Sequence, residues 1–263
     1  MRYHFSRKQL CIPYAVFLTC FVIAPLVVIF YYAFTNGEGR FSISNLTGFF
    51  SSSNTIGTLF YSILISVTTT CVCLLIAYPV SYILARSKIK KKAILLAIFI
   101  APMWINFTLR IAALKEVLSM LEGNLAYHPF LNTIIGMTYD YLPFMILPLY
   151  TTLMKLDNNL LEAAYDLGSS KIDAFTKITL PLSMPGIISG VTMVFLPAMT
   201  NYVILDMLYN NTFIMGSLIG SYFNAYDWHR GSMISIVLLM IIFIIMWATK
   251  GFTEKESERE VIL

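Results

Sequence analysis

The chain has 263 residues, of which 58% are hydrophobic and only 12% are charged, against roughly 25% charged in an ordinary soluble domain. With a mean hydropathy of +0.74, it carries more apolar surface than one soluble core of this length could bury. The composition excludes a water-soluble globule and predicts an integral membrane protein. The formal net charge of +4 is too small to indicate nucleic-acid binding, so no nucleic acid is expected as a partner.

Six runs with few or no charges are long enough to cross a bilayer, which takes about 20 residues per helix. We expect transmembrane helices over about 10–34, 56–85, 93–114, 130–153, 186–208 and 231–249. The first run follows basic residues, as a secretory signal does. It is longer than a signal core and no small-residue cleavage site follows, so it is expected to be a retained helix. The predicted fold is one all-α transmembrane domain over residues 1–263.

The Lys and Arg residues set the expected orientation of these helices. Fourteen of the 18 fall on one side of the membrane when the N-terminus is cytoplasmic, and basic residues concentrate on the cytoplasmic side. The expected outer loops contain only Arg40, Lys115 and Arg230. Both termini are therefore expected in the cytoplasm, together with the hydrophilic loop over 155–185. The basic run from Arg86 to Lys92 is expected to contact anionic membrane lipids.

The chain offers little for catalysis or metal binding. Its cysteines fall in apolar stretches, where they are expected to act as small hydrophobic residues, and Cys71 and Cys73 would point about 200° apart on a helix. No metal site is expected. The sequence also lacks a glycine-rich phosphate loop followed by Lys-Ser or Lys-Thr, so it is not expected to hydrolyse ATP or to hold a cofactor of its own.

The inner loop over 155–185 has the pattern of a helix–turn–helix. The first helix is amphipathic and is expected to end at Gly168, because glycine tolerates a left-handed turn. A second helix is expected to begin at Ser169 or Ser170, which are good N-caps, and to stop at Pro181. Such a surface motif suits a groove on a cytosolic partner. Small side chains that let another backbone come close precede the turn: Ala163 and Ala164.

The same loop resembles the EAA loop of ABC-importer permeases, through Glu162-Ala163-Ala164, Gly168, Ile178 and Leu180-Pro181 at the family's spacing. In that family the loop is the coupling helix that inserts into the ATPase subunit. The resemblance therefore implies that Glu162, Ala163, Ala164 and Gly168 serve ATPase coupling. It also implies the type I importer permease fold in a bacterial inner (plasma) membrane. The implied partners are a second homologous permease, two copies of a cytosolic ABC ATPase that bind ATP and Mg, and an extracytoplasmic binding protein.

Longer stretches resemble the spermidine/putrescine permeases of PotB type over nearly the whole chain: 101–110, 141–150, 156–157, 194–198 and 206–208. The resemblance implies polyamine import. That family usually has Leu-Gly-Gly after the acidic residue, where this chain has Leu208-Tyr209-Asn210-Asn211, which leaves the backbone turn there open. Because the EAA loop does not report the cargo, a metal chelate, thiamine or a phosphonate is an alternative solute. An ion-coupled secondary transporter or channel is the alternative from another class, although repeats or several intramembrane charges would then be expected.

A path for a polyamine needs carboxylates for the ammonium groups and aromatic faces for the cation and its alkyl stem. Asp140 lies roughly 15 Å into its helix by helical rise, near the bilayer midplane. A charge at that depth is costly unless it faces protein or water, so Asp140 is a candidate for the substrate path. Tyr139 and Tyr141 flank it. The alternative is a structural Asp140 that is hydrogen-bonded to a neighbouring helix.

Further candidates for the substrate path lie on the neighbouring spans. Tyr202 and Asp206 share a helix face with Tyr209 near the outer membrane boundary, where an aromatic belt with a solvated Asp is the structural alternative. Trp104 is the candidate on the third span. On that same span Arg110 would repel a polycation, so it is expected to pair with a carboxylate and to set helix packing.

Overall fold

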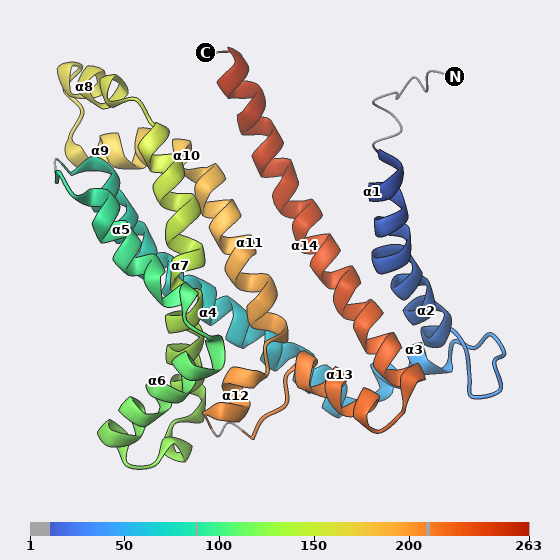
Figure 1. Ribbon diagram of the computed structural model, residues 1–263. Coiled ribbons are helices and arrows are strands. Elements are labelled where there is room, and N and C mark those ends of the chain that lie inside the picture. Colours follow the sequence, from blue (N-terminus) through green and yellow to red (C-terminus); the bar gives the residue numbers. More distant parts are fainter. Residues whose placement is uncertain (1–10, 88, 209–210, 263) are drawn as a thin grey trace, which may run out of the picture. The chain divides into compact units, whose positions relative to one another are not determined.

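The computed structural model describes residues 11–87, 89–208 and 211–262, with side chains described between residues 12 and 247 of these ranges (Figure 1). The described chain is helical throughout, apart from turns and one isolated bridge between Thr35 and Phe41. It divides into two compact units, Met1–Thr58 with Ser217–Ile241 and Leu59–Gly216 with Ile242–Leu263. The all-helical expectation is confirmed for the part of the chain that the structure describes.

The first unit begins with an apolar helical run whose side chains are almost all exposed, as expected of a surface that lipid covers in the membrane. Asn45 ties the following helix to the end of this run, because its side-chain amide donates hydrogen bonds of 3.0 Å to the carbonyl oxygens of Ala33 and Thr35. The elements are α1 (Cys11–Leu18), η2 (Thr19–Ile23), α2 (Ala24–Ala33), α3 (Ser44–Ser51), most of α13 (Met215–Asn224) and the start of α14 (Trp228–Ile262).

The second unit is built around α7, whose buried face supplies much of the core. Figure 1 shows α7 and α11 running side by side. Glycines on α11 permit this close approach: a Cβ at Gly186 would lie 2.7 Å from Thr152 Oγ1 and 3.0 Å from the Pro148 carbonyl oxygen. The elements here are α4 (Ser53–Arg86), α5 (Lys92–Ile100), η3 (Ala101–Trp104), α6 (Phe107–Glu122), η4 (Leu125–Tyr127), α7 (Pro129–Lys155), α8 (Asn158–Asp166), α9 (Lys171–Ala174), η5 (Phe175–Thr179), α10 (Leu180–Leu182), α11 (Met184–Thr200) and α12 (Val203–Met207).

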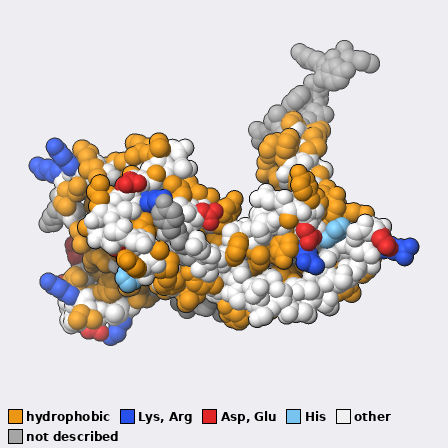
Figure 2. All heavy atoms as spheres, turned by 90° about the horizontal axis from the view of Figure 1, so that it is seen from below, with side chains coloured by type: hydrophobic (Ala, Val, Ile, Leu, Met, Phe, Trp, Pro, Cys, Tyr) orange, Lys and Arg blue, Asp and Glu red, His pale blue; other side chains and the backbone are white. Residues whose placement is uncertain are grey.

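Among the described residues, three helices are long and apolar enough to cross a membrane: Ile12–Ala33, Ser53–Arg86 and Trp228–Trp247. The number rises to five if each of two bent helix pairs forms one span. Hydrophobic side chains are spread over the face seen in Figure 2, and charged side chains occur there in only a few places. The expected helices over 10–34, 56–85, 130–153 and 231–249 have counterparts in the structure. Residue 10, where the first of them is expected to begin, lies outside the described residues together with the N-terminal basic segment.

Two expected helices are not single straight elements. The run over 93–114 is broken at Ile105 and Asn106, where α5 with η3 meets α6 at 99°. Pro102 lacks an N–H for a continuous helix, and the Asn106 side chain starts the next one by accepting bonds from the amides of Thr108 and Leu109. The run over 186–208 ends as α11 at Thr200 and resumes as α12 at Val203. Hydropathy reports how apolar a stretch is but not the direction of its helix axis, so a continuous apolar stretch does not reveal such breaks.

Candidate coupling loop and substrate path

The first helix of the inner loop, α8, ends at the turn expected from the sequence. Asp157 caps its start by accepting a 2.9 Å bond from the amide of Asn159. At its end, Gly168 has φ +81°, its N–H bonds to the Tyr165 carbonyl, and the N–H of Ser169 bonds to the Ala164 carbonyl, both at 2.9 Å. These two bonds form a Schellman motif with glycine in the left-handed position.

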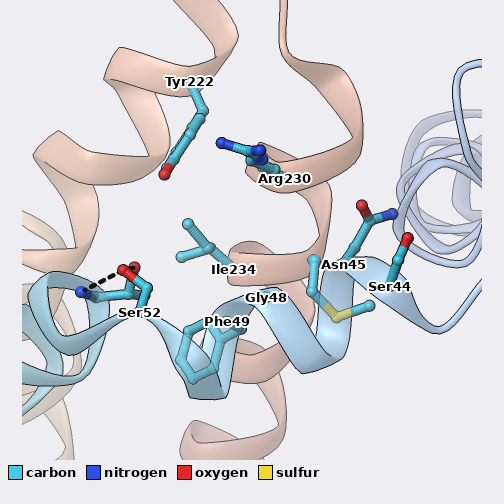
Figure 3. Close-up of a pocket in the computed structure, with 10 residues that line it drawn as sticks. Ser44, Asn45, Gly48, Phe49, Ser52, Tyr222, Arg230 and Ile234 are labelled. Atoms are coloured by element: carbon cyan, nitrogen blue, oxygen red, sulfur yellow. Dashed lines mark hydrogen bonds between the residues drawn. The ribbon is translucent and has the colours of Figure 1, made fainter.

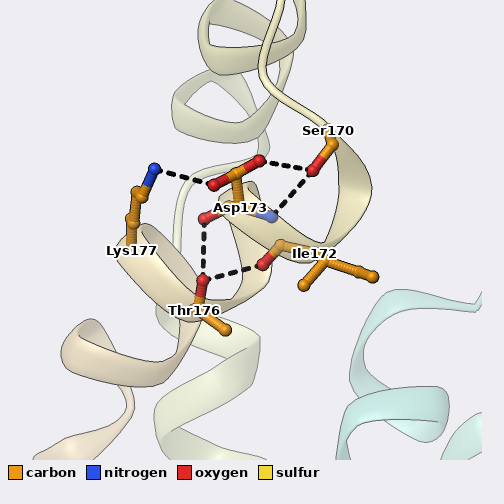
Figure 4. A network of polar contacts seen from close by, with 5 residues as sticks. All are labelled: Ser170, Ile172, Asp173, Thr176 and Lys177. Atoms are coloured by element: carbon orange, nitrogen blue, oxygen red, sulfur yellow. Dashed lines mark hydrogen bonds and ion pairs between the residues drawn. The ribbon is translucent and has the colours of Figure 1, made fainter.

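The second helix of the loop begins at Ser170, the second of the two expected caps. Its Oγ accepts a 3.1 Å bond from the Asp173 amide and donates a 2.5 Å bond to the Asp173 carboxylate (Figure 4). Lys177 lies 2.7 Å from the same carboxylate. The hydrogen bonds from Lys177 and Ser170 and the charge of Lys177 hold the pKa of Asp173 below its usual value. The cap therefore fixes the turn between the two helices.

The expected stop at Pro181 is wrong by one residue, because the helical path continues to Leu182 and bends at Ser183. A π-helical turn, η5, precedes the proline, and the N–H of Leu180 bonds to the carbonyl of Phe175, five residues earlier. Pro181 then takes a position in the first turn of α10, where a missing N–H is tolerated. The helical segment from α9 through α10 meets α11 at an angle of 61°.

The four candidate coupling residues differ in exposure. Ala164 is buried, whereas Glu162, Ala163 and Gly168 are exposed. Two large apolar side chains at the turn are also exposed, Leu167 at 87% and Ile172 at 76%. An exposed apolar tip between two capped helices is chemically suited to contact another protein.

Contacts that the sequence did not indicate join this loop to α4. The ring of Phe175 packs edge-on against Tyr78 and Tyr82, with centroid distances of 5.8 and 5.9 Å. The Tyr78 hydroxyl lies 2.9 Å from the Ser183 hydroxyl, at the bend between α10 and α11. The spacing of Tyr78 and Tyr82, one turn apart on one helix face, is the only signal in the sequence for this site.

Arg86 also joins α4 to the inner loop. Its guanidinium donates a 3.2 Å bond to the Leu156 carbonyl oxygen and a second bond to the Asn158 side chain. Arg86 therefore holds the chain where α8 begins. It also belongs to the basic run that is expected at the inner membrane surface.

Asp140, the carboxylate expected inside the membrane, forms an ion pair with Arg110, and both side chains are buried. The expectation that Arg110 pairs with a carboxylate is confirmed. The pair joins α6 to α7, and α12 packs against both helices. The approach of α12 is close, since a Cβ at Gly136, one turn before Asp140, would lie 3.0 Å from Ile204 Cγ2.

The structure brings some of the expected path residues together and separates others. Tyr141 is buried beside Asp140 in the chain, and its hydroxyl accepts a 2.8 Å bond from the Asn201 side chain. Tyr139 is exposed, so it lies on a different face of α7. Exposed positions also hold the remaining three candidates: Trp104 on η3, Tyr202 before α12 and Asp206 on α12. Tyr209 and Asn210 lie outside the described residues, as does the turn that departs from the family pattern.

A cavity of about 310 Å³ lies within the first unit, between α3, α13 and α14 (Figure 3). Its lining is mostly polar, with hydroxyls from Ser44, Ser52 and Tyr222. The ten lining residues include the cationic Arg230 and no carboxylate. Because a cation would meet repulsion there, this cavity is not a candidate for the polyamine path.

The sequence comparisons agree with the loop geometry. Residues 77–252 match the family described as binding-protein-dependent transport system inner membrane component. The spermidine/putrescine transport system permease protein PotB of Haemophilus influenzae is 34% identical over 264 residues, covering 90% of this chain and 92% of the relative. PotB of Escherichia coli is 36% identical over 221 residues, covering 77% of this chain and 80% of the relative.

Solved structures show the same fold. A chain of a bacterial alginate ABC transporter, solved in complex with an alginate pentasaccharide-bound periplasmic protein, superposes with a TM-score of 0.74 at 13% identity and covers 94% of this chain and 93% of its own. A second structure of a bacterial ABC transporter that imports alginate gives a TM-score of 0.67 at 16% identity, covering 93% of this chain and 94% of its own. The chain belongs to the binding-protein-dependent inner membrane permeases of ABC transporters, and among them to the PotB-type permeases.

Proposed function

We propose that the chain is the permease subunit of an ATP-driven ABC importer for polyamines such as spermidine and putrescine, and that it forms half of the translocation path. The observation that carries this proposal is the EAA loop, which is an exposed, doubly capped helix–turn–helix with Gly168 at its turn. The PotB-type relatives, whose names specify spermidine and putrescine, support the choice of cargo.

In the proposed topology the whole chain is one transmembrane domain with six spans and with both termini in the cytoplasm. The bias of Lys and Arg toward one side supports this orientation. The three apolar helices, the two bent pairs and α7 together would supply the six spans. The loop over 155–185 then lies in the cytoplasm.

The coupling loop is proposed to dock on a cytosolic ABC ATPase through Glu162, Ala163 and Gly168, with Ala164 packed inside the loop. The exposed Leu167 and Ile172 support such a contact, because their burial in a partner's groove would remove apolar surface from water. We assign ATP and Mg to two copies of that ATPase. A second homologous permease and an extracytoplasmic polyamine-binding protein complete the proposed complex, and this chain itself performs no chemistry.

Movement of the loop is proposed to reach the membrane helices through its contacts with α4. Phe175 packs on Tyr78 and Tyr82, and Arg86 holds the entry to α8. Closure of the ATPase dimer would displace the loop and, with it, the inner end of α4. The cavity between the two permeases would then open alternately to either side.

The substrate path is proposed to run past the two carboxylates Asp206 and Asp140. Asp206 is exposed on α12 and would meet an ammonium group first, with Tyr202 one turn before it. Asp140 would receive an ammonium group deeper in the membrane, beside Tyr141. Tyr139 and Trp104 offer exposed aromatic faces for the alkyl segments between the ammonium groups.

Uptake assays test this proposal directly. Cells without other polyamine uptake would express the complete transporter and be supplied with labelled spermidine, putrescine, thiamine, a phosphonate or a metal chelate. We expect energy-dependent accumulation of the polyamines alone. Accumulation of another solute instead would retain the ABC permease and reject the polyamine cargo.

A further inference from the structure

The ion pair between Arg110 and Asp140 is unusual for its position. Both side chains are buried, with 7% and 5% of their surfaces exposed, in the segment that we assign to the membrane. A buried ion pair is poor evidence for stability, because apolar residues of similar volume often stabilise a protein equally well. The contact between α6 and α7 also has an apolar basis, since Ile111 and Met137 belong to the hydrophobic core and Leu114 packs against it. The pair therefore calls for a reason other than helix packing.

The guanidinium of Arg110 is incompletely satisfied. Its contact with Asp140 runs through a single nitrogen, Nη2. Within the part of the chain that the structure describes, Nε and Nη1 are buried without a hydrogen-bond partner. Arginine–carboxylate pairs are frequently bidentate, and most buried donors have a hydrogen-bond partner. The Arg110 contact is thus weaker than an arginine–carboxylate pair can be, and another cation could compete for the carboxylate.

Asp140 and Arg110 lie on helices that are packed to different extents. Asp140 lies in the middle of α7, which packs along α11 over a long contact. Arg110 lies in the first turn of α6, directly after the Asn106 cap and the 99° break from α5. A rotation of α6 at this break would withdraw the guanidinium while the carboxylate stays in place.

We propose that Arg110 is an internal counter-ion, which holds Asp140 while no substrate is bound and is displaced by an ammonium group of the passing polyamine. This inference rests on the proposed function, in which Asp140 belongs to the substrate path. The exchange keeps the buried carboxylate paired throughout, because one cation leaves as another arrives. It also makes Arg110 a determinant of specificity, since a neutral solute offers the carboxylate no charge that could replace the guanidinium.

Substitutions that separate competition from packing test the exchange in the complete transporter. In Arg110→Gln the competing cation is gone, so we expect the KM for spermidine uptake to fall roughly threefold to tenfold. In the double variant Arg110→Gln with Asp140→Asn, two amides can form a neutral hydrogen bond at the same place. We expect this variant to accumulate in the membrane like the wild type and to lose uptake roughly tenfold or more.

The matched control is Glu116→Gln, which removes an exposed carboxylate from the same helix and should leave KM and uptake unchanged. Uptake by the neutral double variant at the wild-type rate would overturn the exchange, and so would an unchanged or raised KM in Arg110→Gln. If Arg110→Gln fails to accumulate because its buried carboxylate is unpaired, uptake by the neutral double variant still tests the exchange. Failure of the wild-type complex to import polyamines would overturn the proposed function and the exchange together, whereas wild-type uptake with an equally active neutral pair would overturn the exchange alone.

Discussion

Gly168 is the residue on which the geometry of the coupling loop depends most. Its φ of +81° is unfavourable for residues with a Cβ, yet a Cβ built there would meet no atom within 4 Å. The requirement for glycine therefore comes from the backbone and not from crowding within this chain. The left-handed conformation costs roughly 1–2 kcal/mol for an ordinary residue and less for asparagine.

We expect Gly168→Val to disturb the Schellman turn and to uncouple ATP hydrolysis from uptake, while the permease stays in the membrane. The measurement is polyamine uptake per ATP hydrolysed in the reconstituted complex, which should fall severalfold. Gly168→Asn is the matched control, because asparagine tolerates the left-handed region and should retain most of the coupling. Normal coupling in Gly168→Val would show that the turn is not required.

Asp173 makes the cap of the second loop helix dependent on pH. Its pKa is lowered in the folded protein by Lys177 and Ser170, so it binds fewer protons in the folded than in the unfolded loop at acidic pH. The stability that it contributes is present at neutral pH and is lost as the pH falls below roughly 4, through the folded pKa.

We therefore expect amide exchange over residues 171–179 to speed up as the pH falls below roughly 4, after correction for intrinsic exchange. In Asp173→Asn the exchange should be faster at neutral pH and should lose this acid dependence. An acid dependence that is the same in the variant and the wild type would contradict the assignment to Asp173.

At the scale of elements, the contact between α7 and α11 depends on the absence of side chains. Gly186 faces the Thr152 side chain and the Pro148 carbonyl oxygen, and a backbone atom cannot yield as a flexible side chain can. We expect Gly186→Ala to lower the stability of the detergent-solubilised complex by roughly 1–3 kcal/mol. Thermal unfolding would measure this change.

Gly57→Ala is the matched control for that variant. Gly57 lies in α4, where a Cβ would meet no atom within 4 Å, so alanine should be neutral or slightly stabilising there. Equal melting temperatures for Gly186→Ala and the control would show that α7 and α11 have room to adjust.

The contact of Phe175 with α4 predicts how the movement of the loop is coupled to the membrane helices. Phe175→Leu keeps an apolar side chain but removes the edge-on contacts with Tyr78 and Tyr82, which are worth about 0.5–1.5 kcal/mol per aromatic pair. We expect basal ATP hydrolysis to persist and its stimulation by the loaded binding protein to fall. Unchanged stimulation would show that force reaches the membrane helices by another contact.

The sequence predicts those elements whose determinants are local. The turn at Gly168 and the cap at Ser170 depend on residues within one or two helical turns, and the structure confirms both. The need of Arg110 for a carboxylate follows from the cost of a buried charge. That its partner is Asp140 depends on the packing of α6 on α7, which no local pattern encodes.

The features that the sequence did not predict depend on contacts between distant residues or on changes in the direction of a helix axis. Phe175 meets Tyr78 across almost a hundred positions of the chain, so nothing nearby in the sequence signals the contact. The break at Asn106 lies inside a continuous apolar run, where hydropathy alone indicates one straight helix. The ATPase, the second permease and the binding protein contribute surfaces that this chain does not contain.

The whole molecule is, in the proposed function, half of a transporter in which other subunits hydrolyse ATP and deliver the cargo. The coupling loop would receive the movement, α4 would transmit it, and the carboxylates on α7 and α12 would contact the cation. This division of roles would make ATP hydrolysis by the complex depend on the solute that the binding protein carries.

The most direct test is the ATPase activity of the complete complex in liposomes. Binding protein loaded with spermidine or putrescine would be compared with the same protein unloaded and with a binding protein that carries a metal chelate. We expect stimulation of ATP hydrolysis by the polyamine-loaded protein alone. Equal stimulation by the metal-chelate carrier, or a complex without any associated ATPase activity, would contradict it.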